Sequence, residues 1–235
     1  MNAEIPKTIL LYRFLDAAAA LMTIESRQFR ISRLRDLNDP FEWRLGYKGI
    51  KPEFEPKFSS WLESVIEQQN KLFGLVCFSD TAKEPVLWSH YADKHRGVVL
   101  EVDYLNNPEH VIQMRYPPER LVMDAEKILE FQTDESYRKD YILPLLSKMI
   151  RRKSPSWAYE REYRVHLDLL QDNDLQITGG YYFKRIPDNF LTRVILGWKC
   201  PLEEQYVLKA LQTVGLNSTK VVRAKISPDS YEVLF

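Results

Sequence analysis

The sequence predicts an α+β fold, a single domain over residues 1–235 with a mixed, largely antiparallel sheet flanked by helices. Segments with strand periodicity and segments with helix periodicity alternate along the chain without regular βαβ order, and several expected strands follow one another near the C-terminus. The chain has 235 residues, of which 45% are hydrophobic, so it can bury a substantial core.

The N-terminal half supplies strands and helices in turn. Residues 8–15 (TILLYRFL) form an apolar strand, and a helix over 16–27 follows because Asp16 is a typical N-cap before an alanine run. Phe29 and Ile31 alternate in a short strand over 28–34, which ends in a polar turn. The remaining expected elements are a helix over 55–72, a strand over 73–79, a helix over 84–95 and a strand over 97–104.

The C-terminal half is richer in strands. A strand is expected near 110–116, and a long helical region runs from about 124 to 152, with Pro144 as a point of interruption. Further strands are predicted over 159–167, 179–186, 193–198 and 220–226, and a helix over 201–215 is closed by Gly215.

The composition restricts the classes of protein. Lysine plus arginine equals aspartate plus glutamate, at 33 each, so net charge does not direct the chain to nucleic acid or to a membrane. Cys77 and Cys200 lie far apart in apolar segments, which is typical of a reduced, cytoplasmic protein. We expect neither a signal peptide nor a membrane span, because no run of about 18 apolar residues occurs.

The segment WAYEREYRVHL, residues 157–167, gathers ionisable side chains. If it is extended, Glu160, Glu162, Arg164 and His166 share one face, whereas Tyr163 and Val165 face the core. A helix is the alternative, since Glu160 and Arg164 are also spaced as an i,i+4 ion pair. The preceding Pro155 and the many aromatic and β-branched residues favour the strand.

Three other stretches bring polar residues to the ends of elements. LNDPFE is a turn in which Asn38 and Asp39 can hydrogen-bond nearby backbone, and Ser79 ends an apolar strand either at the rim of the sheet or as part of a helix cap. In WSHYADKHR, Trp88 and Tyr91 share a helix face, as core or as binding residues. His90 and His95 miss the i,i+4 spacing of helical metal ligands, and no metal is predicted.

Five short motifs, which follow one another in a fixed order, resemble those of a widespread bacterial family filed as a domain of unknown function. They are LYRF, LNDPFE, CFS, LWSHYADKHRGVVLEVD and SWAYEREYR, and they extend from about residue 11 to about residue 197. The resemblance implies a family but no activity.

A second, more distant resemblance concerns the order of an arginine, a serine and a Glu-x-Glu pair. It is similar to mono-ADP-ribosyltransferases of the arginine–serine–glutamate type, which use NAD as a substrate. The resemblance implies that Glu162 stabilises the oxocarbenium-like centre formed when the nicotinamide bond breaks, while Glu160 activates the acceptor. Ser79 would complete the catalytic set by fixing the carboxylate or the ribose. The substrate-binding residues would be Tyr12, Arg13 (for the pyrophosphate), Asn38, Asp39, Trp88, Ser89, His90, Tyr91, His95 and Arg164.

The sequence also departs from that pattern, and other functions stay open. Asp80 and Thr81 follow Ser79 where a Thr-Ser pair is expected. The charged row could be a structural ion-pair network. A non-catalytic module could stack a nucleotide or nucleic acid on Trp88, Tyr91, Trp157, Tyr159 and Tyr163 beside Arg96, Arg161 and Arg164. A metal-dependent nuclease could use Asp39, Glu42, Glu160 and Glu162. The expected partners are an NAD-like small molecule and a protein or nucleic-acid acceptor, with no membrane.

Overall fold

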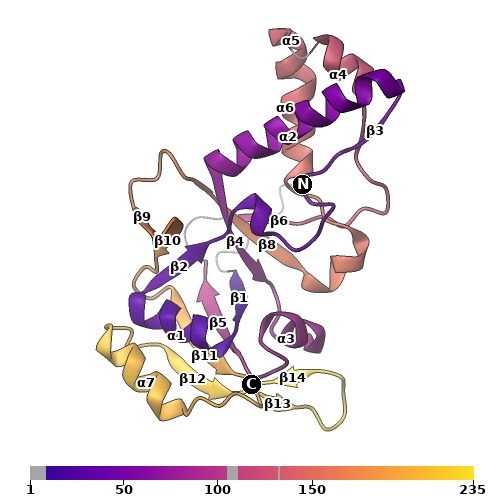
Figure 1. The fold of residues 1–235 in the computed structure, drawn as a ribbon. Coiled ribbons are helices and arrows are strands. Elements are labelled where there is room, and N and C mark those ends of the chain that lie inside the picture. Colours follow the sequence, from indigo (N-terminus) through magenta and orange to yellow (C-terminus); the bar gives the residue numbers. More distant parts are fainter. Residues whose placement is uncertain (1–8, 105–110, 132) are drawn as a thin grey trace, which may run out of the picture.

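A computed structural model describes residues 9–104, 111–131 and 133–235 (Figure 1). Within this part of the chain, the main sheet has seven strands in the order β12-β11-β5-β1-β4-β8-β6. Neighbours are antiparallel except for β11 and β12. The expected α+β fold with a mixed, largely antiparallel sheet is therefore confirmed. The strands are β1 (Leu10–Leu15), β4 (Phe73–Ser79), β5 (Val98–Asp103), β6 (Val111–Gln113), β8 (Glu162–Asp168), β11 (Leu191–Leu196) and β12 (Lys220–Arg223).

Smaller sheets lie around the main one. β10 (Tyr181–Arg185) pairs with both β2 (Gln28–Ile31) and β9 (Leu175–Thr178). Two further pairs join β3 (Gly46–Lys48) with β7 (Val122–Asp124), and β13 (Lys225–Ile226) with β14 (Val233–Leu234).

Helices cover both faces of the main sheet (Figure 1). One face packs against α1 (Ala17–Ser26) and α7 (Glu204–Thr213) around buried Leu11, Leu100 and Val194. On the other face, α3 (Pro85–Tyr91) brings Trp88 against Val99 and Ile195. Farther along that face, α2 (Glu55–Leu72), α4 (Ala125–Phe131) and α6 (Leu143–Met149) form a helical lobe that packs on Leu75 of β4.

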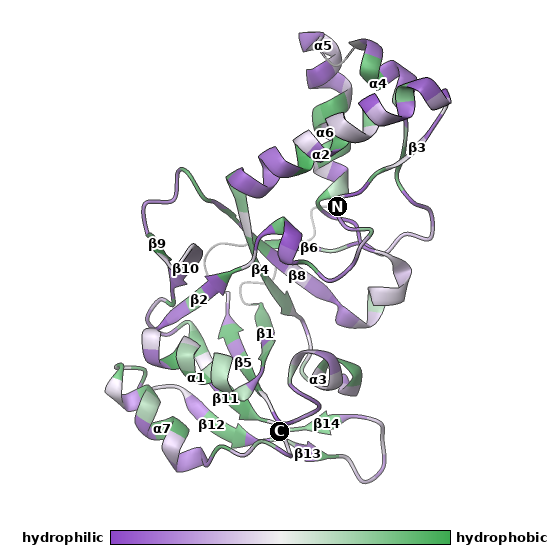
Figure 2. Ribbon diagram, viewed as in Figure 1, coloured by the Kyte–Doolittle hydropathy of each residue, from purple (hydrophilic) through white to green (hydrophobic). Residues whose placement is uncertain are grey.

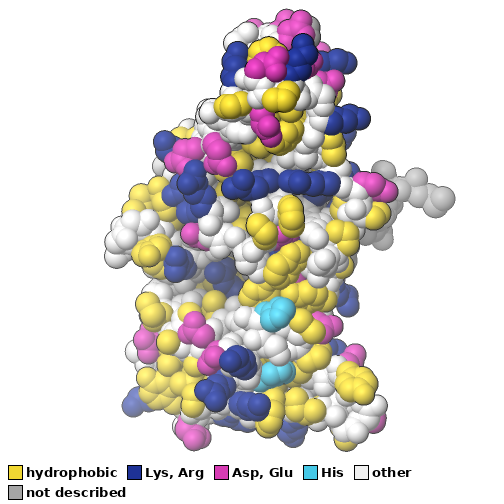
Figure 3. Space-filling model, turned by 45° about the vertical axis from the view of Figure 1, so that its right-hand side comes forward, with side chains coloured by type: hydrophobic (Ala, Val, Ile, Leu, Met, Phe, Trp, Pro, Cys, Tyr) yellow, Lys and Arg dark blue, Asp and Glu magenta, His cyan; other side chains and the backbone are white. Residues whose placement is uncertain are grey.

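Hydropathy follows this arrangement. In Figure 2 the central strands β1, β5 and β11 are mainly hydrophobic, whereas α2 carries both hydrophilic and hydrophobic residues. Phe58, Leu62 and Ile66 are the buried residues of α2, as its spacing predicts. On the face shown in Figure 3, acidic and basic side chains are interspersed with exposed hydrophobic ones, which agrees with the balanced composition.

Most expected elements are present with small shifts at their ends. Asp16 caps α1 by accepting a hydrogen bond from the Ala19 backbone N–H, as expected for an N-cap. The helix expected over 84–95 ends at Tyr91, because Asp93, Lys94 and His95 all adopt left-handed backbone angles. The helical region of 124–152 is divided into α4, α5 (Glu135–Tyr137), the π-helical segment η4 (Arg138–Ile142) and α6, whose first turn contains Pro144.

The main sheet contains a local gap. β1 pairs with β5 along its whole length, but among the described residues it pairs with β4 through Tyr12 and Ser79 alone. Beyond that pair, residues 13–15 of β1 and residues 76–78 of β4 lie without a ladder between them. The space between these strands becomes part of a pocket.

Candidate functional site

The register of the sheet places polar residues in one row. Tyr12 of β1 lies opposite Ser79 of β4, and Ser79 lies opposite Glu162 of β8. Residues directly opposite each other in antiparallel strands share a face of the sheet. The row therefore joins three segments of the sequence that are more than 60 residues apart, at the point where β1 and β4 separate.

A pocket of about 250 Å³ opens at this point, which we call the Glu162 pocket. Its walls come from β1, from the end of β4, from the segment after β2, from α3 and from the residues around η5 (Pro155–Glu160). The residues that line the pocket include several whose side chains can form hydrogen bonds or ion pairs, among them Tyr12, Arg13, Asn38, Ser79, Tyr91, Lys153, Glu160 and Glu162.

Charged side chains are buried behind the pocket in a connected cluster. Lys153 Nζ lies 2.5 Å from Glu160 Oε2, 3.3 Å from Glu162 Oε2 and 3.2 Å from Glu42 Oε1. Arg164, which is 1% exposed, donates from Nε and Nη2 to the two oxygens of Glu162, at 2.7 and 2.9 Å. Its Nη1 lies 2.5 Å from Glu42 Oε2. Three carboxylates and two cations thus neutralise most of one another's charge.

Neutral groups extend this cluster to the pocket surface. Asn38 Nδ2 donates to Tyr91 Oη at 2.6 Å, and Tyr91 Oη donates to Glu160 Oε1 at 2.5 Å. On the other side, the Glu162 backbone N–H donates to Tyr116 Oη at 2.8 Å. The carboxylates are therefore fixed in place from several directions.

The cluster separates the protonation behaviour of the two glutamates. Burial raises the pKa of Glu162, but Arg164 and Lys153 outweigh burial and bring it to about 2. Burial raises the pKa of Glu160 above its ordinary value, against the opposite effect of Lys153. Burial also raises the pKa of Tyr91, and Glu160 raises it further. At neutral pH Glu162 is an ionised carboxylate on the pocket wall.

Arg13 differs from the other charged residues because no acidic residue contacts it among those described. Burial lowers the pKa of its guanidinium to about 10. Nη2 donates to the Arg30 backbone carbonyl at 3.0 Å, and the guanidinium carbon lies 5.3 Å from the centre of the Phe29 ring. Within the described part of the chain, Nη1 is buried without a hydrogen-bond acceptor.

The strand expected over residues 159–167 begins later than predicted. β8 starts at Glu162, Glu160 ends the 3₁₀ helix η5, and Arg161 between them has a left-handed φ of 47°. The prediction that Glu160 lies on the same strand face as Glu162 is wrong, because Glu160 belongs to η5 and the left-handed Arg161 interrupts the extended conformation. The two carboxylates converge instead through Lys153, which contacts both. Val165 is buried in the core and Tyr163 packs against it, as expected.

The structure gathers part of the predicted site residues around the Glu162 pocket. Tyr12, Arg13, Asn38, Ser79, Tyr91, Glu160 and Glu162 line it. Arg164 stands behind Glu162 and is fully buried, so it supports the carboxylate without reaching the pocket. The Ser79 hydroxyl accepts from the Thr81 backbone N–H at 3.2 Å, which is a local turn contact.

Other predicted binding residues serve different purposes. Asp39 is buried and accepts from the backbone N–H of Phe41 at 2.9 Å, so it holds a turn. Trp88 is fully buried, and its indole donates to the Ala82 carbonyl at 2.7 Å. Ser89 Oγ and His95 Nε2 are 3.4 Å apart, and His90 Nδ1 lies 2.9 Å from Tyr159 Oη; none of these three lines the pocket. Trp88 and Arg164, which the binding-module alternative includes in its aromatic and basic groove, are both buried and cannot belong to an open groove.

The sequence interpretation missed Lys153 and gave Glu42 a minor place. Lys153 stands in RRKSPS, which reads as a solvated basic segment, and Glu42 stands in a turn. Nothing in either local pattern signals burial, since the partners lie on other elements.

The carboxylates of the described residues are not arranged to bind a metal ion. No group of three or more histidine, cysteine, aspartate or glutamate side chains in that part of the chain could hold a metal ion. Asp39, which the nuclease alternative requires, contacts the Phe41 and Ser154 backbone N–H groups, whereas Glu42, Glu160 and Glu162 converge on Lys153.

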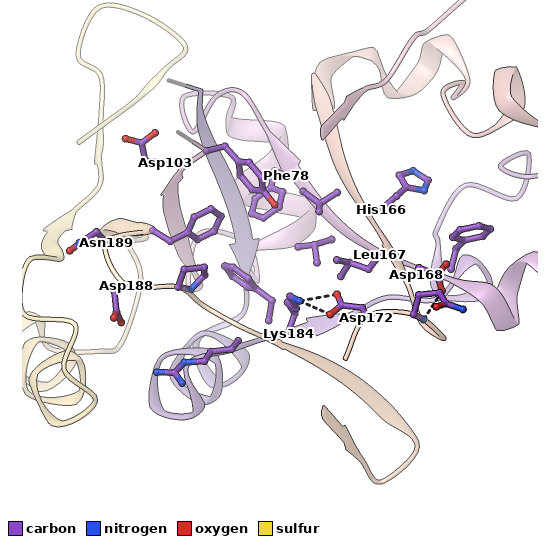
Figure 4. A pocket seen from close by; sticks show the side chains of 18 residues that line it. Phe78, Asp103, His166, Leu167, Asp168, Asp172, Lys184, Asp188 and Asn189 are labelled. Atoms are coloured by element: carbon purple, nitrogen blue, oxygen red, sulfur yellow. Dashed lines mark hydrogen bonds and ion pairs between the residues drawn. The ribbon is translucent and has the colours of Figure 1, made fainter. Parts of the chain in front are cut away.

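A larger cavity of about 1020 Å³ lies on the opposite face of the sheet (Figure 4). Its walls combine aromatic and aliphatic side chains with polar and charged ones, and Lys184 pairs there with Asp172 at 2.7 Å. Figure 4 shows Asp103 and His166 at its margins, directed away from its centre. None of the residues predicted to be catalytic or substrate-binding lines this cavity.

The fold and the pocket define an α+β protein with a ligand-sized pocket backed by a buried ion-pair cluster. The family model described as "Protein of unknown function (DUF2971)" matches residues 87–165, about a third of the chain. The match confirms the resemblance to a domain-of-unknown-function family over this stretch, which contains Tyr91, Glu160 and Glu162. No curated protein and no solved structure matches the chain. No helix of the described residues is long and apolar enough to cross a membrane.

Proposed function

We propose that the protein binds NAD or a similar nucleotide in the Glu162 pocket and cleaves its nicotinamide glycosidic bond, as ADP-ribosyltransferases do. One observation carries the proposal. The ionised Glu162 carboxylate stands in one cross-strand row with Ser79 and Tyr12, and Arg13, whose guanidinium is incompletely paired, also lines the pocket. A negative charge and a phosphate-binding cation are the two groups that such a reaction requires.

The reaction uses the fixed charge of Glu162. As the bond between ribose C1′ and the nicotinamide nitrogen breaks, its electron pair leaves with nicotinamide and positive charge develops on the ribose. Glu162 stabilises that charge, and Arg164 with Lys153 keeps the carboxylate ionised and oriented. Glu160 accepts the proton of the attacking nucleophile, and its raised pKa suits a general base.

The size of the pocket indicates which part of the nucleotide enters. A volume of about 250 Å³ is smaller than the pockets that enclose a drug-sized ligand. We infer that the nicotinamide ribosyl end enters, and that the pyrophosphate meets Arg13 near the gap between β1 and β4.

A second candidate function is nucleotide binding without turnover. Both Glu162 oxygens already accept charged hydrogen bonds, from Arg164 and from Lys153. A carboxylate so fully engaged has little capacity left for a ribose hydroxyl. In this reading the cluster shapes the pocket and performs no chemistry.

The test follows nicotinamide release and NAD binding separately. Wild type, Ser79→Ala and Glu162→Gln are incubated with NAD, released nicotinamide is measured by chromatography, and NAD binding by calorimetry. Because Gln leaves the charges of Arg164 and Lys153 uncompensated, the melting temperature of each variant is recorded and assays run below it. The matched control is Asp172→Asn, which changes a carboxylate outside the pocket.

The outcomes separate the two candidates. Release by wild type, reduced about 100-fold or more in Glu162→Gln and unchanged in Asp172→Asn, supports the enzyme. Binding by all variants without release supports the second candidate. Absence of both binding and release in wild type, with protein and nucleic-acid acceptors supplied, contradicts both.

A further inference from the structure

A second pocket lies against the turn that carries Glu42. Its volume is about 250 Å³, and we call it the Trp43 pocket. It is lined by Trp43 and Phe41 from the turn, by Pro117, Pro118 and Arg120 from the segment before β7, and by residues 152–155. Lys153 lines both this pocket and the Glu162 pocket, so the two sites lie on either side of one residue.

In the part of the chain that the structure describes, Trp43 has two unusual features, an unpaired indole N–H and a left-handed backbone conformation. It is 4% exposed, and its indole Nε1 has no hydrogen-bond acceptor among the described residues. A buried indole N–H normally has a partner, because leaving it unpaired costs free energy. Its backbone φ is 57°, in the left-handed region that a bulky residue seldom adopts. The turn therefore holds a hydrogen-bond donor in a strained conformation.

The polar side chains around Trp43 are mainly donors. Arg44, Arg120 and Arg152 line the pocket, against a single acidic side chain, Glu119. Arg120 lies with its guanidinium 5.2 Å from the centre of the Phe41 ring, and Phe41 is 58% exposed. Pro117, Pro118 and Pro155 have no backbone N–H, so these walls offer apolar surface.

We propose that the Trp43 pocket binds a small organic anion, a carboxylate or phosphate joined to a planar ring. The anionic oxygens would accept from Trp43 Nε1 and from the guanidinium of Arg120, and the ring would lie on Phe41 and the proline surface. The pocket is separate from the Glu162 pocket, so this proposal holds whether or not the protein cleaves NAD.

The experiment uses the indole N–H resonances of the full-length ¹⁵N-labelled chain, which has five tryptophans. Trp43→Phe, which keeps a ring and removes the donor, assigns the Trp43 signal. Wild type is titrated with phenyl phosphate, benzoate and inorganic phosphate. Arg120→Ala removes the proposed anion contact, and Arg35→Ala is the matched control, since Arg35 is an exposed arginine that pairs with Glu67 elsewhere on the surface.

We expect phenyl phosphate or benzoate to shift the Trp43 signal in a saturable manner, and the tighter of the two identifies the anionic group. The dissociation constant should rise about tenfold in Arg120→Ala and stay unchanged in Arg35→Ala. Inorganic phosphate should bind more weakly than phenyl phosphate, because it has no ring. A Trp43 signal that no probe moves, or an equal effect of both arginine variants, would overturn the proposal.

Discussion

At the scale of single residues, Lys153 is a buried charge that depends on its neighbours. It is buried, and its one ammonium group contacts Glu42, Glu160 and Glu162. Burial lowers its pKa, but the three carboxylates outweigh burial and raise it above the ordinary value. The ammonium also lies 4.8 Å from the centre of the Trp157 ring. Removing this charge would leave buried carboxylates facing one another.

We therefore predict that Lys153→Met lowers the free energy of unfolding by about 3–5 kcal/mol, because it breaks a buried ion pair and leaves its partners uncompensated. Urea denaturation at neutral pH measures the change. Lys184→Met is the control, since Lys184 pairs with Asp172 and Asp174 in a partly exposed position and should cost about 1 kcal/mol or less. Equal, small losses in both variants would show that the cluster contributes little to stability.

At the scale of elements, the ends of β1, β5 and β11 can approach one another closely because two positions there are glycines, which have no Cβ. A Cβ on Gly97 would lie 2.1 Å from the Leu15 carbonyl oxygen, and one on Gly197 would lie 2.2 Å from the His95 carbonyl oxygen. The Gly197 N–H donates to the Gly97 carbonyl at 2.9 Å. These contacts join the left-handed turn after α3 to the ends of three strands.

Gly97→Ala should therefore destabilise the protein by about 3 kcal/mol or more, because backbone atoms cannot move aside as a flexible side chain could. Thermal and urea unfolding of the variant give the value. The comparison variant is Gly180→Ala, where a Cβ meets nothing within 4 Å but φ is +80°. It should cost about 1 kcal/mol from backbone conformation alone. A Gly97→Ala protein no less stable than Gly180→Ala would refute the close approach.

At the scale of the whole molecule, the free energy of unfolding depends on pH through ionisable groups on one face of the sheet. The polar cluster lies between the hydrophobic residues under α3 and those under the helical lobe. Burial, together with Arg164 and Arg151, lowers the pKa of His166 from 6.5 to about 4. The pKa of Glu162 falls from 4.5 to about 2. Both groups bind a proton less readily in the folded state than in the unfolded state.

The free energy of unfolding should then fall in two stages on acidification. Between pH 6.5 and about 4 the unfolded chain protonates His166 and the folded protein does not, so stability declines by up to about 1.4 kcal/mol per pH unit. The contribution of Glu162 is fully present above pH 4.5 and is lost between pH 4.5 and about 2.

Urea denaturation across pH 3–7 tests the first stage, with His166→Gln beside wild type. The variant should have a smaller slope between pH 6.5 and 4 than wild type and keep the decline at lower pH. Some slope remains because burial also lowers the pKa of His95. His90→Gln is the control, because His90 is exposed and contacts Tyr159 at the surface. An unchanged slope in His166→Gln would mean that the histidine is not held neutral.

By itself, the sequence determined the elements whose signals are local. The N-cap of α1, the apolar spacing of α2 and the hydrophobic runs of β4 and β5 depend on residues a few positions apart, and all four elements lie where those patterns predict. The motifs that resemble the family also indicated polar residues at strand ends. Seven of the residues predicted to be catalytic or substrate-binding line one pocket. The left-handed Arg161, which separates Glu160 from β8, has no comparable signal, because such a conformation is unusual for arginine.

Tertiary structure alone decided the composition of the site. The sequence around Lys153, Glu42 and Arg164 does not indicate which charges they pair with, because their partners come from a turn, a strand and a 3₁₀ helix that meet only in the fold. The same holds for the pocket, which exists because β1 and β4 stop pairing after Tyr12 and Ser79. The physical reason is that burial and charge pairing depend on distance in space. Periodicity along the chain reports only which face a residue occupies, and leaves open which charge it meets there.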